Sequence, residues 1–149
     1  TIEWYTRQFC QRYEHIRVVR QIDVLEQEIP EGFKIVFYRV MQEALTNAAR
    51  HSRADTVTVR LVKGASHFEF EVEDNGCGFD TSNVFDAPDR LSGFGLRGMQ
   101  ERAEICGGFF NLRTWPGAGT SVKVILPLAA ASAFNPNQLG FAESDIVSE

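Results

Sequence analysis

Cysteine, long apolar stretches and surplus positive charge are all scarce in this chain, and each shortage argues against a class of protein. The three cysteines, Cys10, Cys77 and Cys106, are odd in number and widely spaced, which argues against a zinc site and indicates a reducing compartment. No apolar run is long enough to span a bilayer. The net charge is -5, whereas nucleic-acid-binding surfaces are normally basic, so we expect no nucleic-acid partner.

What remains is the composition of one ordinary soluble domain. Of its 149 residues, 44% are hydrophobic and 23% are charged, which is sufficient for a real core. The sequence shows no signal peptide and begins with Thr1 rather than Met, so we expect a piece of a longer protein.

Apolar periodicity divides the chain into alternating helices and strands. The expected elements are a helix end at 1–13, strand 16–24, a helix from Pro30 to about His51, strands 55–63 and 67–74, a polar loop 75–95, a helix from Leu96 to Cys106, and strands 109–115 and 119–127. A polar loop of that length is typical of a lid or a binding loop. The elements predict an α/β (α+β) two-layer sandwich, in which helices cover one face of a mixed, mostly antiparallel sheet.

One expected strand ends in an acidic residue on its apolar side. Residues 68–74 read FEFEVED, and their alternation places Glu71 on the wet face and Asp74 on the buried face. Gly76 and Gly78 follow, so the backbone beyond Asp74 needs unusual freedom. Asp74 either caps the turn that follows, as Asp-Asn-Gly often does, or accepts a hydrogen bond from a ligand.

The helix over residues 33–51 carries a polar stripe opposite its apolar face. The stripe holds Glu43, Thr46, Asn47 and Arg50, with His51 at its edge. A solvated face is the ordinary explanation, but Asn is a poor helix former in mid-helix. A carboxylate, an amide and a guanidinium at this spacing suit a magnesium-phosphate site, because oxygens bind Mg2+ and arginine binds phosphate.

Residues 93–98, GFGLRG, match G-x-G-x-x-G, which is a weak motif without context. No hydrophobic strand precedes it, which excludes a dinucleotide-binding unit, and the other protein-kinase signatures are absent. The segment is therefore either a glycine-rich loop that feeds an anion-binding helix start, or a helix entry with spare glycines.

Three segments taken together resemble one family. Residues 43–51 (EALTNAARH), 74–79 (DNGCGF) and 93–102 (GFGLRGMQER) resemble, in order, the N, G1 and G2 boxes of the GHKL (HATPase_c) ATPase superfamily. The G-x-G-L-x-G-M-x-E-R form of residues 93–102 is most similar to the nitrate-sensor-type (NarL-partner) branch of bacterial sensor histidine kinases. Residues 119–127 resemble the final strand of that branch. The resemblance implies a Bergerat-type ATP-binding fold with bound ATP and Mg2+.

The resemblance divides the chain into three parts. It implies that residues 25–128 are the catalytic ATP-binding domain. Residues 1–24 would be the stub of a dimerisation helix followed by the first strand. Residues 129–149 would be a C-terminal tail and a candidate for disorder.

The resemblance also implies roles along the polar stripe. Glu43 would lie beside the reacting centre as a base or a water-orienting group, which helps the acceptor to lose its proton. Asn47 would hold Mg2+ through its side-chain oxygen, and Arg50 and His51 would lie along the phosphates.

Other implied roles concern the base and the lid. Asp74 would accept a hydrogen bond from the adenine amino group, a donor that guanine lacks at that position. Gly76 and Gly78 would let the backbone pass close to the base, and Thr120 would support Asp74 and the adenine. The residues expected to shape the lid and its phosphate contacts are those of the last box: Gly93, Gly95, Leu96 and Gly98.

The implied reaction transfers the γ-phosphoryl group of ATP to a histidine. His15, His51 and His67 lack the pattern of a phosphoacceptor helix, so the acceptor would lie on a dimerisation domain outside this chain. We then expect a monomeric fragment that cannot phosphorylate itself, cut from a homodimer that passes the group to a response regulator. The fragment would be cytoplasmic, and the parent could be anchored in the bacterial inner membrane.

Three alternatives stay open. The chain could be another GHKL ATPase, such as an anti-sigma-factor-type serine kinase, although the G-L-x-G-M-x-E-R form argues against it. It could be a nucleotide-sensing module without transfer activity, although Glu43 and Asn47 argue against that. A purely structural domain would leave Asp74 and the glycine clusters without a joint cause.

Overall fold

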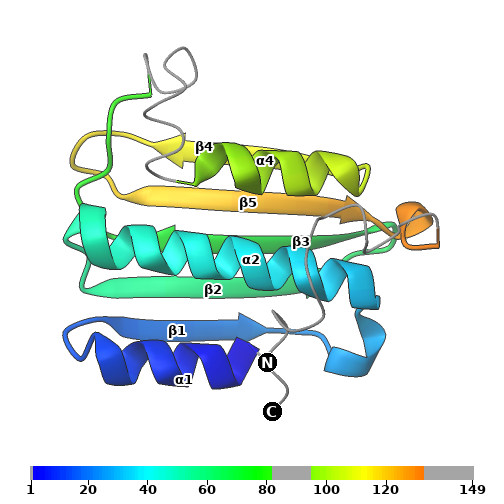
Figure 1. The fold of residues 1–149 in the computed structure, drawn as a ribbon, viewed down its shortest axis with the longest axis horizontal. Helices are drawn as coiled ribbons and strands as arrows, with labels where there is room; N and C mark the ends of the chain where they lie inside the picture. The colour runs from blue at the N-terminus through cyan, green and yellow to red at the C-terminus, as the bar shows by residue number, and fades with distance from the viewer. Residues whose placement is uncertain (1, 82–94, 133–149) are drawn as a thin grey trace.

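The strands form where apolar and β-branched residues alternate with polar ones. In the computed structural model, which describes residues 2–81 and 95–132, they build a five-stranded sheet in the order β1-β2-β3-β5-β4 (Figure 1). Their bounds are Arg17–Ile22 (β1), Thr56–Lys63 (β2), His67–Asp74 (β3), Phe109–Thr114 (β4) and Thr120–Pro127 (β5). The pair β1–β2 is parallel and the other pairs are antiparallel, so the predicted mixed sheet and both predicted hairpins are confirmed.

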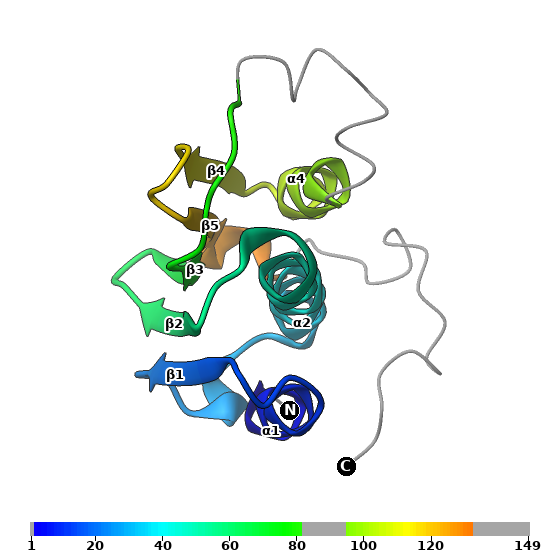
Figure 2. The same ribbon diagram turned by 90° about the vertical axis from the view of Figure 1, so that its left-hand side faces the viewer.

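The helices lie together on one face of the sheet, as Figure 2 shows end-on. They are α1 (Ile2–Arg12), α2 (Glu31–Asn47) and α4 (Leu96–Ile105), with short 3-10 turns at Glu26–Glu28 and Leu128–Ala130. The predicted two-layer sandwich is therefore confirmed. Among the described residues, none of the helices is both long enough and apolar enough to cross a membrane.

The core lies between α2 and the central strands. Phe37 stacks on Phe70 with ring centroids 5.1 Å apart, and Phe33 meets Phe68 edge-on at 6.0 Å. All four rings are at most 1% exposed. The apolar stripe of α2 therefore packs on the face of β3 that ends at Asp74, which fixes the position of the helix over the site.

The first helix joins this layer through Phe9, which is buried in the core, and through Tyr5. Tyr5 of α1 meets Tyr38 of α2 edge-on, with ring centroids 5.5 Å apart, and its side chain is hydrogen-bonded to Thr46. The N-terminal helix is thus tied to the turn of α2 that carries the polar stripe.

The predicted helix to His51 ends differently from the expectation. The α-helix stops at Asn47 and continues as a π-helical turn over Ala48–Ser52, after which Arg53 adopts a left-handed φ of 55°. The Ser52 hydroxyl donates to the Ala48 carbonyl at 2.7 Å and accepts from Ala54 N–H at 3.2 Å. Single π-turns inside α-helices occur frequently at functional sites.

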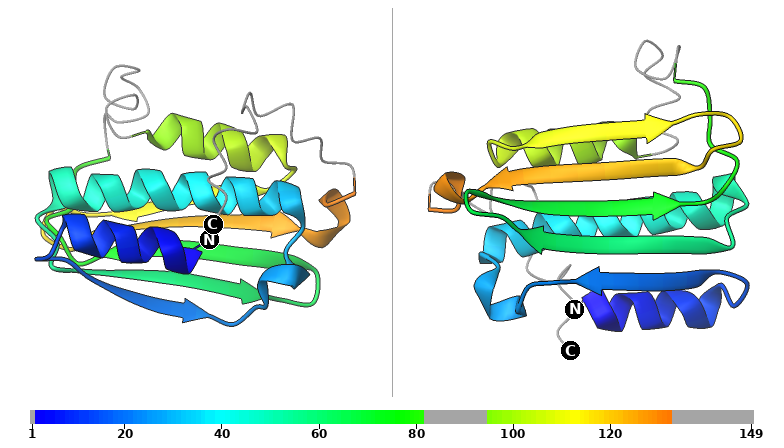
Figure 3. Two further views of the ribbon diagram at one scale, coloured as in Figure 1. Left: turned by 60° about the horizontal axis from the view of Figure 1, so that its bottom comes forward. Right: turned by 180° about the vertical axis from the view of Figure 1, so that it is seen from behind.

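The expectation of a uniformly wet face on β3 is wrong at Glu71. This residue is 4% exposed, although alternation with Phe70 places it on the opposite face of the sheet. The described helices do not cover that face, as the right-hand view of Figure 3 shows. Long side chains from the neighbouring strands cover it: Arg60 contacts it at 2.6 Å and Lys123 at 4.0 Å. Alternation predicts which face a residue occupies, but it does not predict how far its neighbours cover it.

Some expectations fall outside the described residues. Gly93, most of the polar loop 75–95 and most of the tail 129–149 belong to this group. The helix expected from Leu96 is observed as α4, and Gly107 follows it with a left-handed φ of 71°.

Candidate nucleotide-binding site

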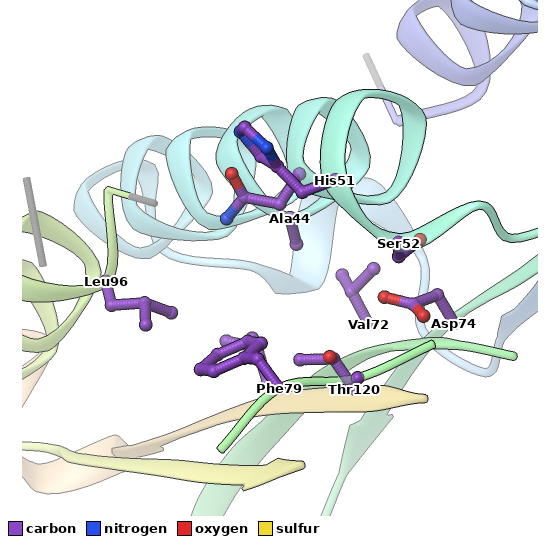
Figure 4. Close-up of a pocket in the computed structure, with 11 residues that line it drawn as sticks. Ala44, His51, Ser52, Val72, Asp74, Phe79, Leu96 and Thr120 are labelled. Atoms are coloured by element: carbon purple, nitrogen blue, oxygen red, sulfur yellow. The ribbon is translucent and has the colours of Figure 1, made fainter. Parts of the chain in front are cut away.

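A cavity of about 190 Å³ opens between α2, the end of β3, the start of β5 and the start of α4 (Figure 4). The lining residues are Ala44, Asn47, His51, Ser52, Val72, Asp74, Gly78, Phe79, Leu96, Thr120 and Val122. Nine of these eleven residues belong to the three predicted motifs and the last strand. The structure therefore brings together segments that are far apart in the sequence.

The walls of the cavity are mostly apolar. Val72 and Val122 lie on neighbouring strands, paired directly across the sheet, and Leu96 approaches from α4. Phe79 lies beside Thr120 in Figure 4. Apolar walls with few polar groups are typical of small-molecule sites, and here they suit a flat aromatic ring.

Asp74 is the acidic group in this lining. It is 9% exposed, and its carboxylate accepts from Gly76 N–H at 2.8 Å and from Thr120 N–H, and it shares the Ser52 hydroxyl proton with the Ala48 carbonyl. Burial raises the pKa of Asp74, although these hydrogen bonds act in the opposite direction. None of the ion pairs found among the described residues includes Asp74, so no cation offsets its burial there.

Gly76 and Gly78 are required by the packing of the protein itself. A methyl group on Gly76 would overlap the Ser52 carbonyl oxygen, and one on Gly78 would overlap the Trp115 carbonyl. Gly78 also has a left-handed φ of 60°. Their predicted closeness to a base stays a prediction, but the structure supplies an independent reason for glycine at both positions.

Sequence reasoning missed Ser52 and Thr114. Ser52 bonds to Asp74 from the π-turn, and Thr114 Oγ1 accepts from Phe79 N–H at 3.0 Å while lying 3.1 Å from Thr120 Oγ1. Neither residue belongs to a motif. A clue to Thr114 was its position opposite Thr120 in the predicted second hairpin.

The polar stripe of α2 divides in the structure. Asn47 and His51 line the cavity, whereas Arg50 is exposed and is not among the lining residues. Glu43 faces the start of α4, where a methyl group added to Gly95 would lie 2.8 Å from its Cδ. The stripe is thus neither a wholly solvated face nor a single ligand set.

Comparison with known proteins gives independent evidence for the family. The sequence model of the family described as "Histidine kinase-, DNA gyrase B-, and HSP90-like ATPase" matches residues 33–130. The chain belongs to this ATPase family. The matched span holds the cavity and the described parts of all three motifs, which places the predicted boxes within the ATPase domain of a histidine kinase.

Sensor kinases are among the relatives of this ATPase domain. It is 34% identical over 113 residues to sensor protein VraS of Staphylococcus epidermidis, and 36% identical over 106 residues to VraS of Staphylococcus saprophyticus. These alignments cover 76% and 71% of this chain but only 30% and 29% of the relatives. The chain thus spans less than a third of the length of the curated relatives it matches.

Solved structures show the same fold. The histidine kinase domain of the Erythrobacter litoralis EL346 blue-light activated histidine kinase superposes with a TM-score of 0.68 at 21% identity, over 85% of this chain and 59% of that one. The Acinetobacter baumannii histidine kinase AdeS gives 0.64 at 16% identity, over 85% and 62%.

The family binds ATP, and the residues of this ATPase domain fit that ligand. The cavity presents an apolar slot with one buried carboxylate that has no cationic partner among the described residues. The described residues contain no group of three or more His, Cys, Asp or Glu that could hold a metal. Asn47 is the amide among the lining residues, and its side-chain oxygen could hold Mg2+ together with oxygens from the phosphates.

Proposed function

We propose that this ATPase domain is the catalytic domain of a two-component sensor kinase, which transfers the γ-phosphoryl group of ATP to a histidine on a separate dimerisation domain. The observation that carries the nucleotide part is Asp74, a buried carboxylate at the edge of an apolar cavity with a raised pKa. A group of this kind needs a hydrogen-bond donor, and the amino group of adenine is one.

The lining residues support distinct roles. Adenine would occupy the apolar slot, with Asp74 accepting from its amino group and Thr120 beside it. Asn47 would hold Mg2+, and the exposed Arg50 together with His51 would lie along the phosphates. Gly76 and Gly78 would bring the backbone near the base, and Gly93, Gly95, Leu96 and Gly98 would shape the lid.

Glu43 would act on the acceptor. In the transfer, the bond from the γ-phosphorus to the bridging oxygen breaks, a bond to the imidazole nitrogen forms, and the imidazole N–H proton passes to the Glu43 carboxylate. ADP leaves with the bridging oxygen. The protein would contribute positioning and charge neutralisation rather than covalent chemistry.

The sensor-kinase relatives support the wider arrangement. We infer a parent homodimer that is anchored in the bacterial inner membrane, passes the phosphoryl group to a response regulator, and belongs to the nitrate-sensor-type branch. This chain would be its monomeric cytoplasmic part, divided at residues 24/25 and 128/129. His15, His51 and His67 would not accept the group, so the isolated chain would not phosphorylate itself.

Calorimetric titration of the chain tests the nucleotide site. We expect ADP and a non-hydrolysable ATP analogue to bind, more tightly with Mg2+, and GTP not to bind. The Asp74→Asn variant should bind ADP roughly ten- to a hundredfold more weakly. Glu73→Gln is the matched control, because Glu73 is the neighbouring carboxylate and is exposed. Equal binding of ADP and GTP, or full binding by Asp74→Asn, would overturn the assignment of adenine to Asp74.

A transfer assay tests the chemistry. The chain is mixed with radiolabelled ATP and a histidine-containing dimerisation domain of a sensor kinase as a separate polypeptide. We expect acid-labile label on the added histidine, none on the chain, and loss of transfer with retained ATP binding in Glu43→Gln. Transfer to serine of a partner would instead support the serine-kinase alternative, and binding without any transfer would support a sensing module.

A further inference from the structure

The helices α2 and α4 run antiparallel, so the start of α4 lies beside the second half of α2 (Figure 1). Gly95 caps α4 with a left-handed φ of 65°, and a methyl group on it would overlap Glu43 Oε2. One turn later, a methyl group on Gly98 would lie 2.9 Å from Arg102 Nη1. Positions 95, 98 and 102 share one face of the helix. That face therefore has two places without side chains, one filled by a carboxylate and one by a guanidinium.

Arg102 lies in a partly buried position among charges of both signs. Burial lowers the pKa of Arg102, and so does the charge of Arg39 on α2, whereas Glu43 and Glu101 act in the opposite direction. A partly buried guanidinium beside a second cation is stable only with an anion close by. Glu43 is the carboxylate that α2 supplies on this side.

A second arginine on the same helix shows the contrast. Arg97 bonds to Glu101 at 3.1 Å, and both side chains are about 60% exposed, at 63% and 59%. This is an ordinary surface pair of the i,i+4 type, which contributes little. Arg102 instead lies with Nη1 beside Gly98 of its own helix and within electrostatic reach of Arg39 and Glu43 on α2.

We propose that Arg102 is a positioning residue for Glu43: the positive charge of its guanidinium, which lies beside Gly98, attracts the Glu43 carboxylate into the space that Gly95 leaves open at the start of α4. The catalytic part of this inference rests on the proposed function, in which Glu43 takes the proton of the acceptor. Residues 93–102 would thus position Glu43 of the N box as well as shape the lid.

A double-mutant cycle tests the coupling without any catalysis. Urea midpoints are measured for the chain, Arg102→Gln, Glu43→Gln and the double variant. We expect Arg102→Gln to lower the midpoint clearly when Glu43 is present and much less when residue 43 is Gln. The control cycle with Arg97→Gln and Glu101→Gln should show little coupling. Equal losses in both Glu43 backgrounds would overturn the inference.

A transfer assay tests the positioning role. With the added dimerisation domain, we expect Arg102→Gln to slow transfer roughly ten- to a hundredfold, because small displacements of a catalytic group carry losses of that order. ADP affinity should stay within about twofold, since Arg102 is not among the cavity-lining residues. Arg102→Lys should restore part of the rate, and Arg97→Gln should leave it unchanged.

The two experiments separate the possible failures. If the unaltered chain transfers nothing, the proposed function fails, and the urea cycle still decides whether Arg102 holds Glu43. If Arg102→Gln keeps the full transfer rate, or loses ADP binding in parallel, the positioning role is wrong even where the kinase assignment holds. Arg102→Lys keeps both tests possible if the glutamine variant does not fold.

Discussion

Strand β3 carries two buried carboxylates, three residues apart and on opposite faces of the sheet. Glu71 lies on the open face at 4% exposure and Asp74 on the helix-covered face at 9%. Glu71 accepts from Ser121 at 2.7 Å and from Arg60 at 2.6 Å, with Arg113 at 3.6 Å and Lys123 at 4.0 Å. Asp74 has only backbone N–H groups and a hydroxyl.

The two environments move the pKa in opposite directions. Burial alone would raise the pKa of Glu71, but the Ser121 hydrogen bond and the charges of Lys123 and Arg60 together lower it. Burial raises the pKa of Asp74, and its neutral donors do not offset that effect. The difference indicates that Glu71 is a completed structural contact, whereas Asp74 is a group prepared for a ligand that arrives later.

The largest expected effect is at Asp74, where a substitution should lower ligand affinity without lowering stability. Asp74→Asn should weaken ADP binding roughly ten- to a hundredfold, the loss expected for a hydrogen bond to a charged group. The urea midpoint at neutral pH should stay the same or rise, because the ionised form is disfavoured by burial. Calorimetry and denaturation of the same sample measure both, and a clear loss of stability would show that Asp74 is mainly structural.

Glu71→Gln should show the reverse pattern. We expect it to lower the free energy of unfolding by about 1–3 kcal/mol, since it leaves charged donors without their anion. ADP affinity should stay within about twofold, because Glu71 is on the face away from the cavity. Loss of ADP binding in a folded Glu71→Gln variant would contradict the separation of the two faces.

The pH dependence of stability sharpens the same contrast. The pKa of Glu71 is below its usual 4.5, so its contribution is present above that pH and is lost as the pH falls through the lowered pKa. The pKa of Asp74 is above its usual 3.8, so its contribution is present below that pH and is lost as the pH rises through the raised pKa.

Urea midpoints as a function of pH measure both effects. On acidification, the advantage of the unaltered chain over Glu71→Gln should shrink. Any advantage of Asp74→Asn over the unaltered chain at neutral pH should shrink as well, because Asp74 becomes protonated. Curves that stay parallel for either variant would contradict the assigned direction of its pKa shift.

The smallest expected effect concerns the rim of the Glu71 cluster. The Arg113 side chain is 70% exposed and lies 3.6 Å from Glu71. Arg113→Ala should change the free energy of unfolding by less than about 0.5 kcal/mol, as is usual for exposed ion pairs. Arg60→Ala, which removes the contact at 2.6 Å, is the comparison and should be more destabilising. Equal effects would mean that net charge, rather than geometry, protects Glu71.

Most of the fold and part of the site could be predicted from the sequence. Alternation identified the strands and the buried position of Asp74, because side-chain period depends only on local geometry. The π-turn was not predictable, since its extra residue is fixed by Ser52 bonding to both Ala48 and Ala54. The burial of Glu71 depends on cross-strand neighbours, which no period within one strand encodes.

The glycine-rich turn after β3 determines which substitutions its positions can tolerate. Cys77 N–H donates to the Ser52 carbonyl at 2.6 Å, and Gly117 N–H donates to the Cys77 carbonyl at 2.6 Å. These bonds use main-chain atoms; the Cys77 side chain is exposed, and its thiol makes one weak bond, to the His51 carbonyl at 3.4 Å. Position 77 should therefore accept many residue types, while 76 and 78 accept almost none. Evolution can alter the chemistry at the rim of the cavity without disturbing the three segments that the turn ties together.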